Sequence, residues 1–172
     1  MSYGPLLQPG AEPAQTSRKT LLGVIDAPEI NVAIFAFLLN FPWELWQVPF
    51  WRDMPNVAHW SGIKSCTFAT VGDVVIALTA FWIIAAALRS RRWIVVPTAR
   101  AAAGFTAIGI AITIILEWIL TGPLQRWTYS ADMPTVPVLG TGLLPLLQWI
   151  ILPPLIVWFV SRQLRGASPA AR

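Results

Sequence analysis

Three acidic residues, Glu44, Asp73 and Glu117, stand inside long apolar stretches of the sequence, although only 12% of its 172 residues are charged. A charged side chain at the centre of a bilayer costs about 2.5 to 3.5 kcal/mol on insertion scales, so an acid retained there usually has a function. Burial and mutual repulsion should keep at least one of the three carboxyl groups protonated near neutral pH. We therefore interpret Glu44, Asp73 and Glu117 as candidate catalytic residues that supply a proton.

A proton donor in apolar surroundings can protonate an alkene or an epoxide, and electron-rich indole faces stabilise the carbocation that results. The expected partner is thus a neutral, lipophilic small molecule. The side chains expected to bind it are Asn40, Trp43, Trp46, Gln47, Trp118, Gln148 and Trp149.

Other chemistry finds little support in the sequence. There is no acidic pair suited to Mg²⁺ and diphosphate, no Gly-rich phosphate loop and no Ser-His pair. One Cys and one His exclude a CxxC motif and a paired-histidine haem site. We therefore expect no metal ion and no cofactor, and we assign the net charge of +4 to membrane orientation, not to nucleic-acid binding.

The elements that position these side chains must be membrane-spanning helices. The chain is 56% hydrophobic, with a mean hydropathy of +0.62, and spanning segments satisfy their backbone internally. The expected fold is an all-α bundle of four transmembrane helices, whose first and fourth helices are kinked by proline. Each segment is close to the roughly 20 residues that cross a bilayer, and the expected spans are 30–50, 66–88, 100–120 and 142–160.

Helix geometry brings the acids to a common depth. At a rise of 1.5 Å per residue, one polar side chain per segment falls about 6 to 10 Å below the outer end of its segment: Glu44, Asp73, Glu117 and Gln148. These side chains should face inward, because lipid offers no hydrogen-bond partner. We expect one acidic pocket in the outer half of the bilayer, walled by Trp43, Trp46, Trp118 and Trp149.

The distribution of Lys and Arg predicts the orientation. Most of these residues fall on the side of the two termini and of the connection between the second and third segments, which predicts a multi-pass protein of the inner cell membrane with both termini cytoplasmic. Residues 1–20 have the composition of a flexible cytoplasmic tail. The transmembrane domain is expected at 21–165 and a second cytoplasmic tail at 166–172.

Two short motifs carry a resemblance to known families. The segment Asn40-Phe41-Pro42-Trp43-Glu44 resembles the Asn-x-x-Trp-Glu segment of the small integral-membrane terpene cyclases of meroterpenoid pathways. Glu117, followed by Trp127-Thr128-Tyr129 and a Pro-rich last segment, is similar in arrangement to the membrane-embedded lycopene cyclases and carotenoid hydratases. The first resemblance implies that Glu44 is a protonating acid, and both imply cyclisation, hydration or isomerisation of an isoprenoid-like substrate.

Alternatives stay open from the sequence alone. Buried acids and amides also hold helix bundles together by hydrogen bonds. The chain is equally consistent with a non-catalytic membrane subunit or a binder of carotenoid, quinone or lipid, and less so with a proton-coupled transporter. Four helices enclose a small cavity, so a homo-oligomer or a partner in a membrane complex is compatible with each function. The recurrence of Asp-Met-Pro at 53–55 and 132–134 also raises the hypothesis of a duplicated helical hairpin.

Overall fold

The computed structural model describes residues 26–166, so the tail expected at 1–20 and all but the first residue of the tail expected at 166–172 lie outside the described residues. The described part of the chain is all-helical, as predicted, with two isolated β-bridges and no strand. Its long helices are α2 (Pro28–Trp46), α3 (His59–Ala87), α4 (Ala99–Thr121) and α5 (Leu143–Gly166). Three short 3₁₀ turns accompany them, η1 (Val48–Phe50), η2 (Met54–Asn56) and η3 (Arg91–Ile94).

Three of these helices, α3, α4 and α5, are long and apolar enough to cross a membrane. The helix α2 is the shortest, with 19 residues, and its buried positions include Asn31, Asn40 and Glu44, which lower its hydropathy. The chain is therefore compatible with a membrane protein, and α2 as a fourth span stays a prediction.

The proline residues fall at defined places in the helices. Pro42 lies inside α2, and Pro153 and Pro154 lie inside α5, both of which continue across these residues. The kinks expected there stay a prediction. Pro49 lies in η1, past the end of α2, so the first helix ends at Trp46 and not at Phe50 as expected.

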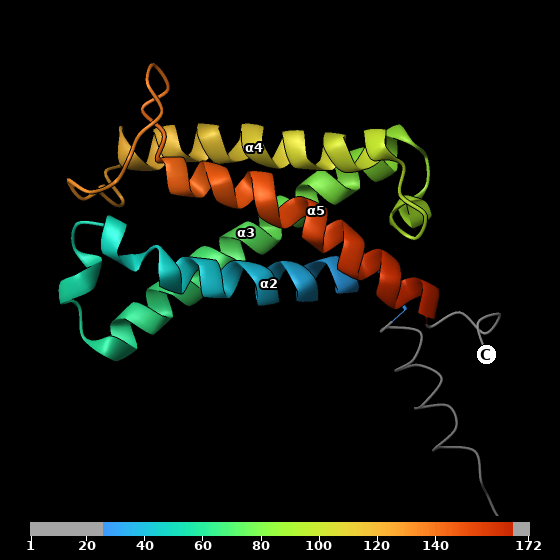
Figure 1. Ribbon diagram of the computed structural model, residues 1–172, viewed down its shortest axis with the longest axis horizontal. Coiled ribbons are helices and arrows are strands. Elements are labelled where there is room, and N and C mark those ends of the chain that lie inside the picture. Colours follow the sequence, from blue (N-terminus) through green and yellow to red (C-terminus); the bar gives the residue numbers. More distant parts are fainter. Residues whose placement is uncertain (1–25, 167–172) are drawn as a thin grey trace, which may run out of the picture.

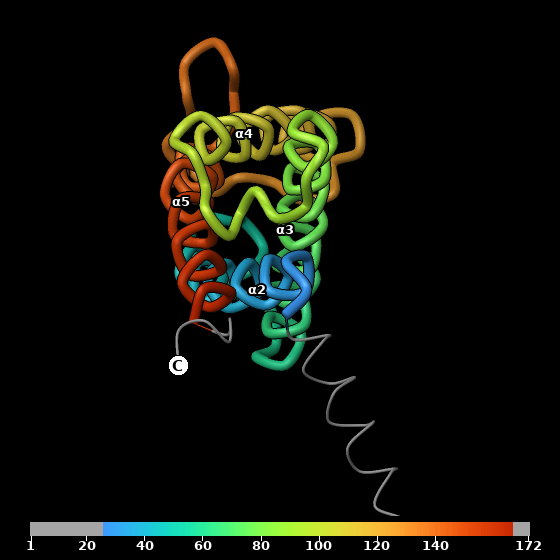
Figure 2. The backbone as a smooth tube through the Cα atoms, turned by 90° about the vertical axis from the view of Figure 1, so that its right-hand side faces the viewer, coloured from blue at the N-terminus to red at the C-terminus, as the bar shows by residue number. Residues whose placement is uncertain are grey.

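The four helices form a ring (Figure 2), and neighbours in the ring run in opposite directions (Figure 1). The helix α2 packs against α3 and α5, and α4 packs against the same two helices from the opposite side. The connections 47–58 and 122–142 lie together at one end of the bundle, which we call the loop end (Figure 1). The connection 88–98 and both ends of the described chain lie at the other end.

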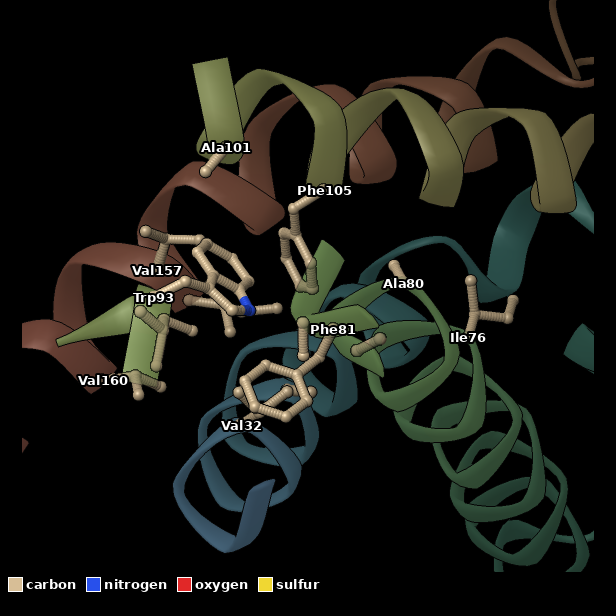
Figure 3. Close-up of a cluster of buried hydrophobic side chains, with 14 of the residues drawn as sticks. Val32, Ile76, Ala80, Phe81, Trp93, Ala101, Phe105, Val157 and Val160 are labelled. Atoms are coloured by element: carbon tan, nitrogen blue, oxygen red, sulfur yellow. The ribbon is translucent and has the colours of Figure 1, made fainter. Parts of the chain in front are cut away.

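A cluster of apolar side chains fills the bundle near the connection 88–98 (Figure 3). Trp93 of η3 inserts between Phe81 of α3 and Phe105 of α4, with ring centroids 5.8 and 6.0 Å apart. The hydroxyl of Ser161 donates to the carbonyl of Val95 at 3.0 Å, which ties this connection to α5. The bundle is thus densely packed at this end.

The outside of the bundle is apolar and its inside carries polar groups. Exposed side chains include Leu38 (57% exposed), Val75 (58%) and Ile115 (56%), whereas Asn40 and Gln148 are each only 2% exposed. A protein in water has the reverse arrangement. This pattern suits a helix bundle surrounded by lipid.

Candidate functional site

A glutamine on α5 connects three helices at the centre of the bundle. The amide nitrogen Nε2 of Gln148 donates to Oδ1 of Asn40 at 2.7 Å, to Oδ2 of Asp73 at 2.9 Å and, more weakly, to Oε1 of Glu44 at 3.3 Å. Asn40 and Glu44 lie on one face of α2, and Asp73 lies on α3. All four side chains are buried. The interhelical hydrogen bonds therefore converge on one donor group.

The carboxyl groups of Glu44 and Asp73 share one donor, because Nε2 of Gln148 lies 3.3 Å from Oε1 of Glu44 and 2.9 Å from Oδ2 of Asp73. Two ionised carboxylates on one donor in a buried site repel each other, so such a pair favours holding one proton. Further donors surround the pair: Nε2 of Gln47 donates to Oε1 of Glu44 at 2.8 Å, and the indole of Trp149 contacts Asp73. The pair is thus a place where one proton is held and its conjugate base is stabilised.

The third acid has a different partner. The hydroxyl of Tyr129 donates to Oε2 of Glu117 and accepts from the backbone N–H of Gly142 at 2.9 Å. Burial and the neighbouring Glu117 carboxylate raise the pKa of Tyr129 above its usual range, so this phenol stays neutral and remains a donor. The interaction fixes the Glu117 side chain and ties α4 to the connection 122–142.

The two connections at the loop end pair with each other above the acids. The N–H of Arg52 donates to the carbonyl of Thr128, and the N–H of Ser130 donates to that of Phe50, both at 2.9 Å. These bonds flank an antiparallel bridge between Trp51 and Tyr129. The rings of Trp51 also pack against those of Trp127 and Tyr129, with centroids 5.9 and 5.2 Å away. We call this paired segment the roof.

Beneath the roof lies a cavity of about 530 Å³ bounded by all four helices, within the size range of small-molecule sites. Its polar wall comprises the side chains of Glu44, Gln47, Asp73, Thr113, Glu117 and Gln148. Most of the remaining lining is apolar or aromatic, including Trp51, Met54, Phe68, Ile76, Leu116, Leu120, Trp127 and Trp149. Within the described residues, no group of three or more His, Cys, Asp or Glu side chains is arranged to hold a metal ion.

The structure brings together most of the residues singled out from the sequence. Six of them line the cavity: Glu44, Gln47, Asp73, Glu117, Gln148 and Trp149. Asn40 does not line it, but its Oδ1 accepts a hydrogen bond from Gln148, which does. Trp43 is half-buried and does not line it either.

Two tryptophans expected to wall the pocket face away from it. Trp46 is 59% exposed and Trp118 is 64% exposed. Helix geometry explains this correction, because successive residues turn by about 100° around the axis. Trp46 follows the inward-facing Glu44 by two positions and Trp118 follows Glu117 by one, so neither shares the face of its acid.

The aromatic residues that do line the cavity come from the roof. Trp51 and Trp127 were not among the residues expected to wall the pocket, although Trp51 continues the helical spacing of Asn40, Glu44 and Gln47. Cys66 also lines the cavity, 2% exposed, with its Sγ 3.7 Å from the backbone carbonyl of Glu44. No periodic pattern signals the roof itself, because it forms by pairing of two loops.

Known proteins add no further constraint. No protein-family model, curated protein or solved structure matches this chain. The likeness to membrane terpene and carotenoid cyclases therefore stays a prediction from short motifs.

Proposed function

We propose that the protein is a membrane enzyme that uses the Glu44–Asp73 pair as a general acid on a neutral, lipophilic, isoprenoid-like substrate. The observation that carries this proposal is a buried carboxyl pair that shares one amide donor and lines a largely apolar cavity. A proton donor, an apolar binding space and aromatic faces are the three requirements of carbocation chemistry.

The chemistry begins when the proton shared by the pair moves to a substrate alkene or epoxide. For an alkene, the π electrons form the new C–H bond and leave a carbocation. For an epoxide, the oxygen takes the proton and one C–O bond breaks, which leaves a hydroxyl group and a carbocation. The N–H groups of Gln47 and Gln148 hold the negative charge left on the pair, while the ring of Trp149 faces the positive charge in the cavity. Loss of a proton from the cation back to a carboxylate completes a cyclisation or isomerisation. In a hydration, water adds to the cation and the resulting oxonium returns its proton to the carboxylate.

Glu117 offers a second proton-accepting position in the same cavity. Its carboxyl group accepts from Tyr129 and not from Gln148, the donor that Glu44 and Asp73 share. A cation formed next to the pair can therefore lose its proton at a different carbon. Separate sites for protonation and deprotonation allow the double bond of the substrate to move.

The proposal includes a placement in the inner cell membrane with four spans. Six arginines cluster at the end of the bundle opposite the roof: Arg89, Arg91, Arg92, Arg100, Arg162 and Arg165. Positively charged residues favour the cytoplasmic side. This supports cytoplasmic termini and a cavity in the outer half of the bilayer, with α2 completing the ring as the fourth span.

Two conservative variants test the proposal. Glu44→Gln and Asp73→Asn keep size and hydrogen bonding but remove an ionisable group, so conversion should fall by about 10² to 10⁴. Glu29→Gln is the matched control, because Glu29 lies at the opposite end in an ion pair with Arg91. The assay incubates each protein in vesicles with neutral isoprenoids and with co-purified lipids, and analyses the products by mass spectrometry.

The wild type and Glu29→Gln should convert a substrate, while both cavity variants should retain near wild-type thermal stability. Full conversion by Glu44→Gln would overturn the acid role. Binding without conversion by the wild type would instead favour the alternative of a non-catalytic lipid-binding protein.

A further inference from the structure

The cavity is closed at both ends of the bundle. Trp93, Phe81 and Phe105 fill the end opposite the roof, and Figure 3 shows Trp93 and Phe105 converging there from different elements. At the loop end, Trp51 and Trp127 of the roof pack edge to face and line the cavity. A lipophilic molecule therefore has no direct path along the axis of the bundle.

One side of the cavity is open instead. The exposed lining residues are Ser65, Phe68 and Gly72 on one face of α3, and Arg126 just after α4. Phe68 is 77% exposed. Across from them, α4 contributes a second row of lining residues at helical spacing, Thr113, Leu116 and Leu120. Of the four neighbouring helix pairs, α3 and α4 are the least closely packed.

This opening is a cleft that runs along the two helices. The lining residues of α3 extend from Ser65 to Ile76, which corresponds to about 16 Å at 1.5 Å per residue. Both helices are apolar enough to cross a membrane, so the cleft faces the acyl chains. It is continuous with the part of the cavity that holds Asp73, because Gly72 and Asp73 are adjacent and both line it.

We propose that the substrate reaches the acids sideways from the lipid through the cleft between α3 and α4, and that the chain of a long substrate stays in this cleft during reaction. This inference rests on the proposed function, since it requires a lipophilic substrate in the cavity. It identifies that substrate more closely, as a neutral chain longer than the cavity itself. Gly72 then determines specificity, because its lack of a side chain sets the width of the cleft.

The surroundings of Gly72 make it suitable for a test. A Cβ atom built on Gly72 meets no other atom within 4 Å, so a larger side chain can extend into the cleft without displacing the helices. Gly109 on α4 is the opposite case, because a Cβ there would collide with the ring of Trp149. Glycine is also an unfavourable residue in the interior of a helix, so substitutions at Gly72 should leave thermal stability unchanged or raise it.

The experiment compares Gly72→Phe with Val75→Phe, a matched control on α3 whose residue is 58% exposed and does not line the cavity. Each full-length protein, in lipid nanodiscs, is mixed with geraniol or with the longer geranylgeraniol. Quenching of Trp fluorescence gives the association rate and the affinity. Thermal unfolding of each variant confirms that it is folded.

The association rate of both alcohols should fall about tenfold or more in Gly72→Phe and not in Val75→Phe. The affinity for geranylgeraniol should fall more than that for geraniol, because only the long chain occupies the cleft. If the wild type binds both alcohols and Gly72→Phe binds them at the same rate, the lateral route is wrong and the proposed function is untouched. If the wild type binds neither alcohol, the proposed function is wrong, and the lateral route, which depends on it, is wrong as well.

Discussion

Replacing Gln148 with leucine removes the donor that connects three helices at the cavity. The amide nitrogen has two hydrogens, which serve Oδ1 of Asn40 at 2.7 Å and Oδ2 of Asp73 at 2.9 Å. Glu44 loses only its weaker contact at 3.3 Å, because Gln47 still donates to the same oxygen. Leucine is of similar size, so the loss of hydrogen bonds dominates the effect.

The magnitude follows from these two bonds. Interhelical hydrogen bonds in membrane proteins contribute about 0.6 kcal/mol on average and up to about 1.7 kcal/mol. The Gln148→Leu variant should therefore be less stable by about 1 to 3 kcal/mol, the sum of two such bonds. For a chain of this size, the loss lowers the melting temperature by roughly 3 to 10 °C.

Thermal unfolding in detergent, followed by circular dichroism, measures this loss. Gln163→Leu is the matched control, because it makes the same change at an exposed position of α5. A double-mutant cycle with Asn40→Leu should also give a coupling of about 0.6 to 1.7 kcal/mol between Asn40 and Gln148. Equal stability of Gln148→Leu and Gln163→Leu, or strictly additive effects in the cycle, would refute the hydrogen-bonded centre.

Two further predictions concern the roof and the orientation. Because the folded protein raises the pKa of Tyr129, the stability due to its neutral phenol is present below about pH 10, the unfolded value, and is lost above it. Tyr129→Phe should be less stable than the wild type at pH 7 but should lose less stability between pH 9 and pH 11; parallel melting curves across this range would contradict the assignment. The orientation can be tested with single-cysteine variants on a Cys66→Ser background. A membrane-impermeant maleimide should label Asn56→Cys in intact cells and Ser90→Cys only in inside-out vesicles, because these exposed positions lie at opposite ends of the bundle. The reverse labelling pattern would invert the proposed orientation.

The polar side chains were placed from the sequence more accurately than the aromatic ones. Helices have a constant rise and turn, so the depth and face of Glu44, Asp73 and Gln148 follow from counting residues. The sequence therefore predicted that these groups meet, as they do in the structure, while their catalytic role stays a prediction. Trp46 and Trp118 were assigned by residue type without regard to helix face, and their exposure corrects that assignment.

The roof could not be predicted from the sequence. Its contacts depend on an antiparallel bridge between two irregular connections that are far apart in the chain. Such pairing leaves no periodic signal in either connection. The partner of Glu117 was missed for this reason, because Tyr129 reaches the acid only when the connection 122–142 folds back over α4.

The hypothesis of a duplicated hairpin gives a physical reason why the cavity opens on one side only. In such a duplication, α2 corresponds to α4 and α3 corresponds to α5. The α3–α4 interface of the ring then corresponds to the α5–α2 interface (Figure 2). If the two hairpins are aligned at Asp73 and Gln148, which lie at a similar depth, and not at the two Asp-Met-Pro segments, Gly72 is the equivalent of Leu147. Leu147 is partly buried, and the α5–α2 interface is further closed by the bond from Gln148 to Asn40. A Cβ atom on Gly72 would meet no other atom within 4 Å, so the lack of a side chain at this position, together with the lack of a counterpart to the Gln148–Asn40 bond among the interactions described there, accounts for the path from the lipid to the acids at the α3–α4 interface.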